Sequence, residues 1–167
     1  MKKLLLSVLL TVSYLQFTNA QVNVNIAIQP AWAPVGYDYV DYYYIPDIDA
    51  YYNVPAQQYI YLDNGGWIYS TGLPPRYRDF DIYHSYKVVI NEDKPYLRND
   101  VYRSKYVGYK GRHDQLIIRE SNDSRYFINR NHPQHKIWKQ EHRNNGNGNN
   151  GHHGNGGGNG RGRGHHK

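Results

Sequence analysis

Four aromatic side chains in the middle of the chain have residue types and spacing that suit a ligand-binding surface. Tyr59 and Tyr61 alternate along one extended run, and Trp67 and Tyr69 alternate along the next. Alternate residues of a strand point to the same face of a sheet, and aromatic rings offer a large contact area at low entropic cost. We therefore predict that these four rings line one face that contacts a glycan or another partner. The aliphatic residues between them are then expected to face the core, namely Ile60, Leu62 and Ile68.

The number of tyrosines supports a second interpretation of these rings. The chain holds 19 tyrosines in 167 residues. A tyrosine ring can form core wherever its hydroxyl reaches water or a backbone partner. We expect most of the rings to form core, and the four named above to be the exception.

Two histidine pairs in the C-terminal tail could bind a metal ion. His152-His153 and His165-His166 lie in a Gly/Asn-rich segment, and neutral imidazole is a ligand for Zn, Ni and Cu. A flexible loop between the pairs would bring three or four nitrogens together, at an entropic cost that lowers the affinity. Metal binding by these histidines is the alternative to a solvated linker.

Catalytic patterns are absent from the sequence. Four aspartates cluster at Asp38, Asp41, Asp47 and Asp49, beside Pro and Tyr, as is usual for solvated residues in turns. No nucleophile elbow, His-Glu-x-x-His pattern, phosphate loop or dinucleotide fingerprint accompanies the histidines. We predict a protein that is not an enzyme and needs no cofactor.

The N-terminus has the three parts of a secretory signal peptide. Lys2 and Lys3 precede an apolar stretch, Leu4 to Phe17, of 14 residues, and small residues at positions 18 and 20 mark a cleavage site. Because roughly 18 to 20 apolar residues are needed to span a membrane as a helix, we interpret residues 1–20 as a removable leader. The mature chain is predicted to begin at Gln21, to have no transmembrane segment, and to reach the periplasm, the cell surface or the medium.

Charge and composition limit what the exported protein can do. The chain has no cysteine, so disulfides, thiol nucleophiles and thiolate metal sites are excluded. The formal net charge is +6, and acidic residues prevail before residue 75 while basic residues prevail after it. Such a basic end attracts polyanions, which for an exported protein are envelope lipids or acidic glycans rather than intracellular nucleic acid.

Extended runs rich in aromatic and β-branched residues predict an antiparallel β-meander. Its strands are expected at Tyr39–Ile45, Ile48–Val54, Tyr59–Leu62 and Trp67–Tyr69, and Asn64-Gly65 suits a tight hairpin between the last two. Further strands are expected at Val22–Ile28 and Tyr86–Ile90, and a helix is expected at Pro95–Tyr106. Leu116–Ile118 and Tyr126–Ile128 suggest a last hairpin, with a helical interpretation left open. Trp32, between Pro30 and Pro34, is expected to plug the core.

The order of motifs in the middle of the chain resembles an uncharacterised family of exported bacterial proteins with a YYYYPD…YYDV…YIYL…GW…LP…Y pattern and a low-complexity tail. The resemblance covers roughly residues 37–96, with Ile45 in place of the fourth Tyr and Asn53 in place of an Asp. It rests on the following segments: Tyr42-Tyr43-Tyr44-Ile45-Pro46-Asp47-Ile48, Tyr51-Tyr52-Asn53-Val54, Tyr59-Ile60-Tyr61-Leu62, Gly66-Trp67, Leu73-Pro74 and Arg76-Tyr77. The resemblance implies export and fold, and no activity.

These observations predict a β-rich α+β fold with one short helix and three regions along the chain. Residues 1–20 form a signal peptide, residues 21–143 a tyrosine-rich domain, and residues 144–167 a disordered Gly/Asn/His/Arg tail that has nothing to bury. The predicted function is that of a non-enzymatic envelope or secreted protein, a surface-binding or structural module.

Overall fold

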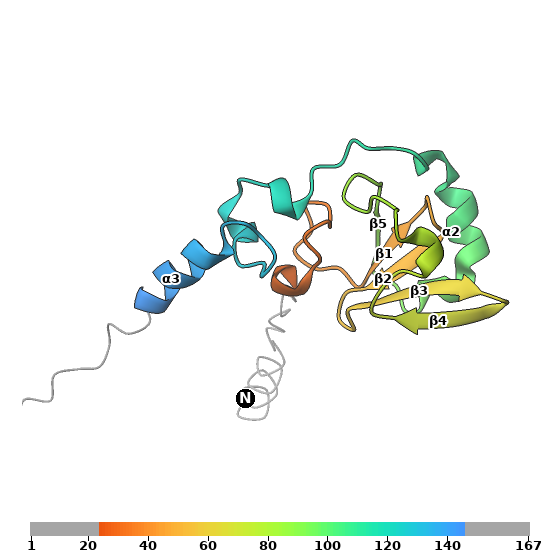
Figure 1. The fold of residues 1–167 in the computed structure, drawn as a ribbon, viewed down its shortest axis with the longest axis horizontal. Helices are drawn as coiled ribbons and strands as arrows, with labels where there is room; N and C mark the ends of the chain where they lie inside the picture. The colour runs from red at the N-terminus through yellow and green to blue at the C-terminus, as the bar shows by residue number, and fades with distance from the viewer. Residues whose placement is uncertain (1–23, 146–167) are drawn as a thin grey trace, which may run out of the picture.

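The computed structural model describes residues 24–145, which form one five-stranded antiparallel sheet with short helices around it. The strand order is β4-β3-β2-β1-β5 (Figure 1). The strands are β1 (Tyr42–Ile45), β2 (Ala50–Asn53), β3 (Gln58–Asp63), β4 (Gly66–Ser70) and β5 (Val88–Ile90). The predicted β-rich α+β fold, with its meander of aromatic strands, is confirmed.

The hairpin between β3 and β4 forms at the predicted turn. Asn64 and Gly65 have φ angles of 46° and 79°, and Asp63 pairs with Gly66 across them. Both central residues of this turn type need a positive φ, which Asn and Gly adopt most readily. The turn chemistry therefore fixes the pairing of the two strands.

Two α-helices and six single-turn 3-10 helices complete the described residues. The predicted helix at residues 95–106 is confirmed as η3 (Pro95–Arg98) followed by α2 (Asn99–Lys105). A second helix, α3 (His135–Asn145), was not predicted and projects from the end of the molecule remote from α2 (Figure 1). The remaining 3-10 helices are η1 (Ile26–Ile28), η2 (Pro75–Tyr77), η4 (Val107–Tyr109), η5 (Ile118–Glu120) and η6 (Ser124–Tyr126).

The predicted strand at residues 22–28 is wrong in its described part, which forms η1. The Asn25 side chain donates to the Val40 carbonyl oxygen (2.7 Å) and accepts from the Val40 amide (3.1 Å). The Asn25 side chain thus occupies the backbone groups of Val40 that a neighbouring strand would otherwise pair with. After Asn25 the chain turns into η1.

The predicted hairpin between residues 116–118 and 126–128 is also wrong. Its first segment bonds instead to the segment around Trp32: the Ile118 amide donates to the Ala33 carbonyl, and the Val35 amide donates to the Leu116 carbonyl. Its second segment begins in η6, where the Asp123 carboxylate accepts from the Arg125 amide. A distant part of the chain supplied the better partner, which local pattern does not reveal.

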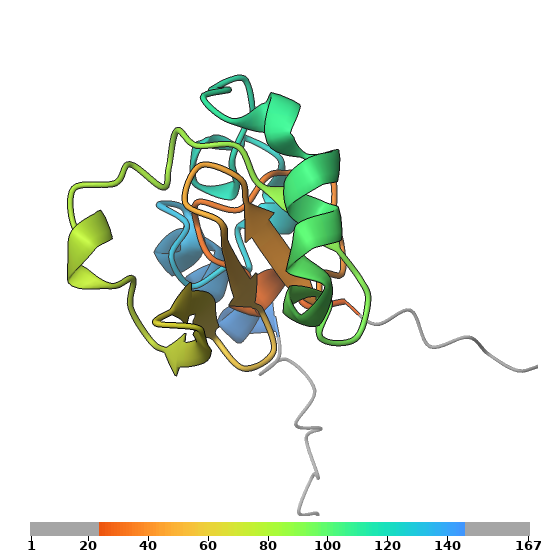
Figure 2. The ribbon, with the colours of Figure 1, turned by 90° about the vertical axis from the view of Figure 1, so that its right-hand side faces the viewer.

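Buried residues lie on both sides of the sheet. We call one side the helix face, where η3 and α2 cover the strands (Figure 2); its buried cluster is Tyr42, Tyr44, Tyr51, Ile60, Ile90, Tyr96 and Tyr102. We call the other side the groove face; its main buried cluster is Ile26, Trp32, Ala33, Val40, Tyr43, Val54, Ile118 and Tyr126. Eight of the 18 tyrosines in residues 24–145 are buried, so the expectation that most of the rings form core is met only in part.

Candidate functional site

The structure places the four predicted contact rings on two different faces. In the β3–β4 register, Ile60 lies opposite Tyr69 and Leu62 lies opposite Trp67. Residues directly opposite each other in a ladder share a face, so Trp67 and Tyr69 lie on the helix face. Tyr59 and Tyr61 lie on the groove face. The prediction of one shared aromatic face is therefore wrong.

The aliphatic residues do not behave as expected either. Ile60 is buried, but Leu62 and Ile68 are each 40% exposed, since they lie near the outer end of the hairpin. Of the four rings, Tyr61 is buried against Ile45 and Ile48. Leu62 and Ile68 therefore stand outside the core that the prediction assigned to them.

The two rings on the helix face pack against Tyr96. Trp67 lies 5.4 Å from the Tyr96 ring, and the Tyr69 hydroxyl donates to the Tyr96 hydroxyl at 2.9 Å. Tyr59 alone, of the four predicted rings, lines an open groove on the groove face.

This groove has a volume of about 610 Å³ and a floor of three aromatic rings. The Trp32 ring lies 5.2 Å from Tyr52 and 6.4 Å from Tyr59, and Tyr52 and Tyr59 are themselves 4.9 Å apart. The two tyrosines are a cross-strand pair of β2 and β3. We call these three rings the aromatic floor.

Trp32 joins the aromatic floor from a segment outside the sheet. It is 6% exposed and packs edge-on against Tyr43, so its predicted role as a plug over the core is confirmed. The same ring also lines the groove, a second role that the sequence did not indicate.

Tyr83 forms another wall of the groove, and a buried lysine holds its loop in place. The Lys87 ammonium donates to the carbonyl oxygens of Tyr83 (3.2 Å) and Ser85 (2.8 Å), and it lies 5.8 Å from the centre of the Trp32 ring. Lys87 is 1% exposed, and this burial lowers its pKa to about 8. The backbone carbonyls of Tyr83 and Ser85 thus both bond to the Lys87 ammonium, which lies behind the aromatic floor.

Asn129 links two segments of the chain that line the groove. Its fully buried amide donates to the carbonyls of Ile26 (2.8 Å) and Gln29 (2.7 Å), and its oxygen accepts from the Asn131 amide (3.0 Å). Residues 27–31 and residues 130–131 line the groove on either side of this anchor. The groove is therefore held open by hydrogen bonds already present in the free protein.

The polar groups of the groove suit non-covalent binding. Burial raises the pKa of the Tyr59 hydroxyl to about 12 and also raises that of Tyr52, so both remain neutral donors and acceptors. The Tyr59 hydroxyl bonds to the Trp32 side chain, whereas the Tyr52 hydroxyl has no hydrogen-bond partner among residues 24–145. Side chains of Gln57, Thr71 and Asn131 add further donors and acceptors. No Asp, Glu or His is found among the described residues that line the groove.

The clustered aspartates take part in structural contacts. Asp49 accepts from the Tyr44 hydroxyl (2.9 Å) and the Asn99 amide (3.1 Å) and pairs with Arg103. Asp47 accepts from the Gly111 amide (2.7 Å), and Asp38 pairs with Arg125.

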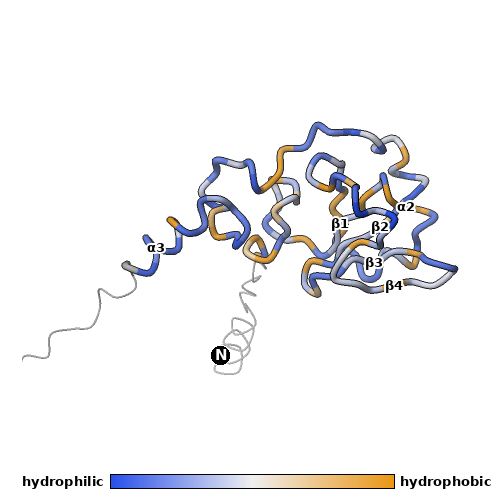
Figure 3. The backbone as a smooth tube through the Cα atoms, in the orientation of Figure 1, coloured by the Kyte–Doolittle hydropathy of each residue, from blue (hydrophilic) through white to orange (hydrophobic). Residues whose placement is uncertain are grey.

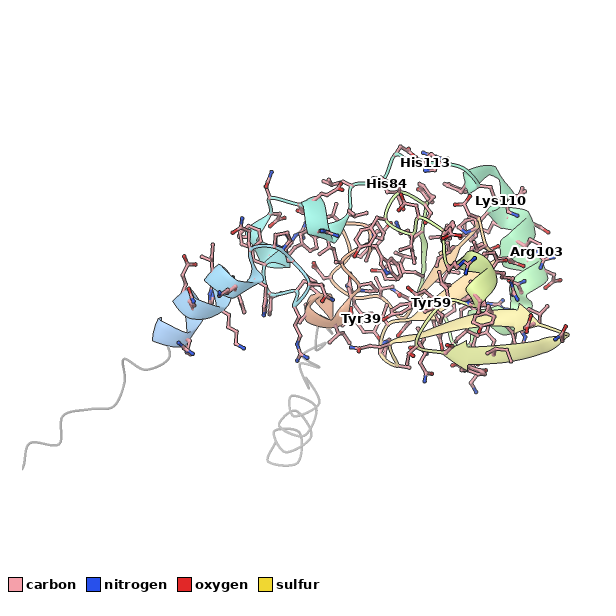
Figure 4. All side chains as sticks on the ribbon, in the orientation of Figure 1. Tyr39, Tyr59, His84, Arg103, Lys110 and His113 are labelled. Atoms are coloured by element: carbon pink, nitrogen blue, oxygen red, sulfur yellow. The ribbon has the colours of Figure 1, made fainter. Side chains whose placement is uncertain are left out.

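The histidines of the described region are dispersed. His84 pairs with Asp81, and His113 bonds to the His84 carbonyl, at an edge well apart from Tyr59 (Figure 4). Within residues 24–145 no three His, Asp or Glu side chains gather as a metal site would require. The predicted metal ligands, His152, His153, His165 and His166, lie outside the described residues.

Helix α3 carries a stripe of basic residues. Lys136, Lys139 and Arg143 follow one another at helical spacing and are exposed. The helix is mostly hydrophilic (Figure 3), and its Trp138 ring stacks against His142 at 4.3 Å. This stripe continues the basic character that the sequence assigns to the C-terminal end.

Comparison with protein-family models, with curated proteins and with solved structures finds no match to this chain. Among the helices of residues 24–145, none has the length and apolar character needed to cross a bilayer. Function must therefore be argued from the groove itself. Sequence reasoning found Tyr59 but missed Tyr52, Tyr83 and Arg130, which only the chain's long-range folding brings to the same groove.

Proposed function

We propose that this protein is an exported, non-enzymatic binding protein whose groove holds a glycan of the cell envelope. The observation that carries the proposal is the aromatic floor, with two neutral tyrosine hydroxyls beside it, of which that of Tyr52 has no partner among the described residues. Export itself rests on the predicted leader at residues 1–20.

A saccharide has both apolar and polar groups, and this surface offers a partner for each. A pyranose ring has flat patches of C–H groups, which pack on aromatic faces, and a rim of hydroxyls, which need donors and acceptors. The aromatic floor supplies the first, and the hydroxyls and amides around it supply the second. The groove is open and built before binding, so little free energy is lost in ordering it.

The groove also argues against two other ligand classes. An apolar ligand would bury the hydroxyl, amide and guanidinium groups of the walls without partners, which is unfavourable. Acid–base chemistry is carried out most often by histidines and carboxylates, which the described lining lacks, and the raised pKa values of Tyr59 and Tyr52 make these hydroxyls poor acids. Binding without reaction is the function that this set of side chains supports.

The test measures binding of defined oligosaccharides to the predicted mature chain, residues 21–167. The panel contains neutral and acidic tetrasaccharides and peptidoglycan fragments, titrated by calorimetry. We expect Tyr59→Ala and Tyr52→Ala each to weaken binding by about 1 to 2 kcal/mol, or roughly 5- to 30-fold in Kd. The matched control is Tyr69→Ala, an exposed ring of the helix face, which should leave Kd unchanged. Failure of every oligosaccharide to bind, or equal losses in all three variants, would contradict the proposal.

A further inference from the structure

The charge of the groove points to the kind of glycan that it holds, an inference that rests on the proposed function. Among the described residues that line it, Arg130 is the one with a formal charge. Its side chain is exposed and has no carboxylate within ion-pair distance in residues 24–145. Six other arginines of that region are paired with carboxylates: Arg76, Arg78, Arg98, Arg103, Arg112 and Arg125.

The backbone that carries Arg130 is held in position at the groove. It follows directly on Asn129, whose three hydrogen bonds fix the backbone on both sides of the groove. Asn131, the residue after Arg130, also lines the groove, and its backbone amide donates one of those three hydrogen bonds. The guanidinium therefore starts from a fixed backbone, which reduces the entropy lost when it binds.

A second arginine adds positive charge to the same side. The Arg119 guanidinium lies 5.3 Å from the centre of the Tyr83 ring, which is a wall of the groove. Lys87 lies behind Trp32, but Asp47, Asp81 and Glu120 are near enough to offset its charge. The excess of positive charge at the groove thus comes from the two arginines.

We infer that the groove selects a glycan that carries a carboxylate, and that Arg130 recognises that carboxylate. A guanidinium presents two parallel N–H donors that match the two oxygens of a carboxylate. The pair is held by opposite charge and by the fixed direction of its two hydrogen bonds. The aromatic floor holds the sugar ring, and Arg130 pairs with the acid group at its edge. Two kinds of polymer supply this chemistry, polyuronates and the muramyl residues of peptidoglycan.

The test uses a pair of probes with the same sugar rings, one with free carboxylates and the other with each carboxylate capped as a neutral methyl ester. Tetragalacturonate and its methyl ester have the same sugar rings, but the ester is neutral. We expect the unaltered protein to bind the acid about tenfold more tightly than the ester, because a hydrogen bond to a charged group is stronger than one to a neutral group. Raising the salt concentration should weaken binding of the acid and leave the ester unaffected. A muramyl tetrasaccharide with a free carboxylate, titrated in parallel, shows which polymer is preferred.

Arg130→Gln is the decisive variant. It should bring the acid-to-ester ratio close to one, chiefly by weakening binding of the acid, and Arg130→Lys should restore part of the ratio. Arg78→Gln removes an exposed arginine that does not line the groove and should leave the ratio intact. Because Arg130 is exposed, the unfolding midpoint of the variant is expected to match that of the unaltered protein.

The possible failures separate the two proposals. If the unaltered protein binds acid and ester equally, or if Arg130→Gln keeps the ratio, the groove holds glycans but Arg130 does not select for a carboxylate. If neither probe nor the muramyl tetrasaccharide binds, the glycan-binding function itself is wrong.

Discussion

Tyr51 and Tyr52 are neighbours in β2, but their rings lie on opposite faces of the sheet and in different surroundings. On the helix face, Tyr51 is fully buried among the rings of Tyr44, Tyr96 and Tyr102, and its hydroxyl donates to Asn99 at 2.7 Å. On the groove face, Tyr52 is half-buried beside Trp32 and Tyr59. Helix α2 covers the first ring, whereas the second lines an open groove.

The comparison shows that residue type does not decide whether a tyrosine is core or contact surface. On the helix face, the covering elements bring polar partners with them: Asn99 bonds to both Tyr51 and Asp49, and Arg103 pairs with Asp49. On the groove face, the segments that approach the sheet leave the hydroxyl of Tyr52 without such a partner in the described residues. Tyr51 is therefore expected to contribute mainly to stability, and Tyr52 mainly to binding.

The largest expected effect comes from truncating the two neighbouring rings. Tyr51→Ala removes a fully buried ring and leaves a cavity, and should lower the free energy of unfolding by about 3 to 5 kcal/mol. Tyr52→Ala removes a half-exposed ring and should lower it by about 1 to 2 kcal/mol, since less apolar area is lost. Urea unfolding followed by tyrosine and tryptophan fluorescence measures both. Equal losses would mean that the two faces contribute alike to stability.

Removal of the hydroxyls alone sharpens the comparison. Tyr51→Phe leaves the Asn99 amide oxygen without its donor in a buried position, and should lower the free energy of unfolding by about 1 to 2 kcal/mol. Tyr52→Phe removes a hydroxyl that has no partner in residues 24–145 and should change stability by less than about 0.5 kcal/mol. The same urea measurement applies to both variants. A Tyr52→Phe loss as large as that of Tyr51→Phe would reveal a partner for its hydroxyl.

The smallest expected effect concerns the cation behind the groove face. In the unfolded chain Lys87 keeps its proton up to a pKa near 10.5, but in the native protein it loses the proton above about 8. Between these values unfolding takes up a proton, so a rise in pH favours the native state. We expect stability to increase by on the order of 1 kcal/mol between pH 8 and pH 9.5.

Above about pH 10 the trend should reverse. Burial raises the pKa of Tyr59 to about 12, above its ordinary value of 10.0, so the unfolded chain releases that proton first and is favoured. The variant Lys87→Met, measured by urea unfolding across this range, is the control: the rise between pH 8 and pH 9.5 should vanish and the fall above pH 10 should remain. A rise that persists in Lys87→Met would assign it to another group.

Several features of the protein could be predicted from local sequence because local forces decide them. Asn64-Gly65 determines the β3–β4 hairpin through its two positive φ angles, and the aromatic runs determine the strands. The two-residue turn also sets the register, with Leu62 opposite Trp67, so the faces of the four predicted rings followed from the same turn. The pairing set by this turn places Trp67 and Tyr69 on the face opposite to Tyr59 and Tyr61.

The groove and the role of each face were decided by tertiary structure. Trp32 meets Tyr52 and Tyr59 because the N-terminal segment packs across the sheet, and Asn129 bonds to Ile26 and Gln29 from about 100 residues away along the chain. Hydrophobic burial, which drives such packing, has no direction and no sequence period that would name the partner. The sequence therefore determined which residues form strands and turns, whereas the packing of distant segments decided which tyrosines became core and which were left to line a groove.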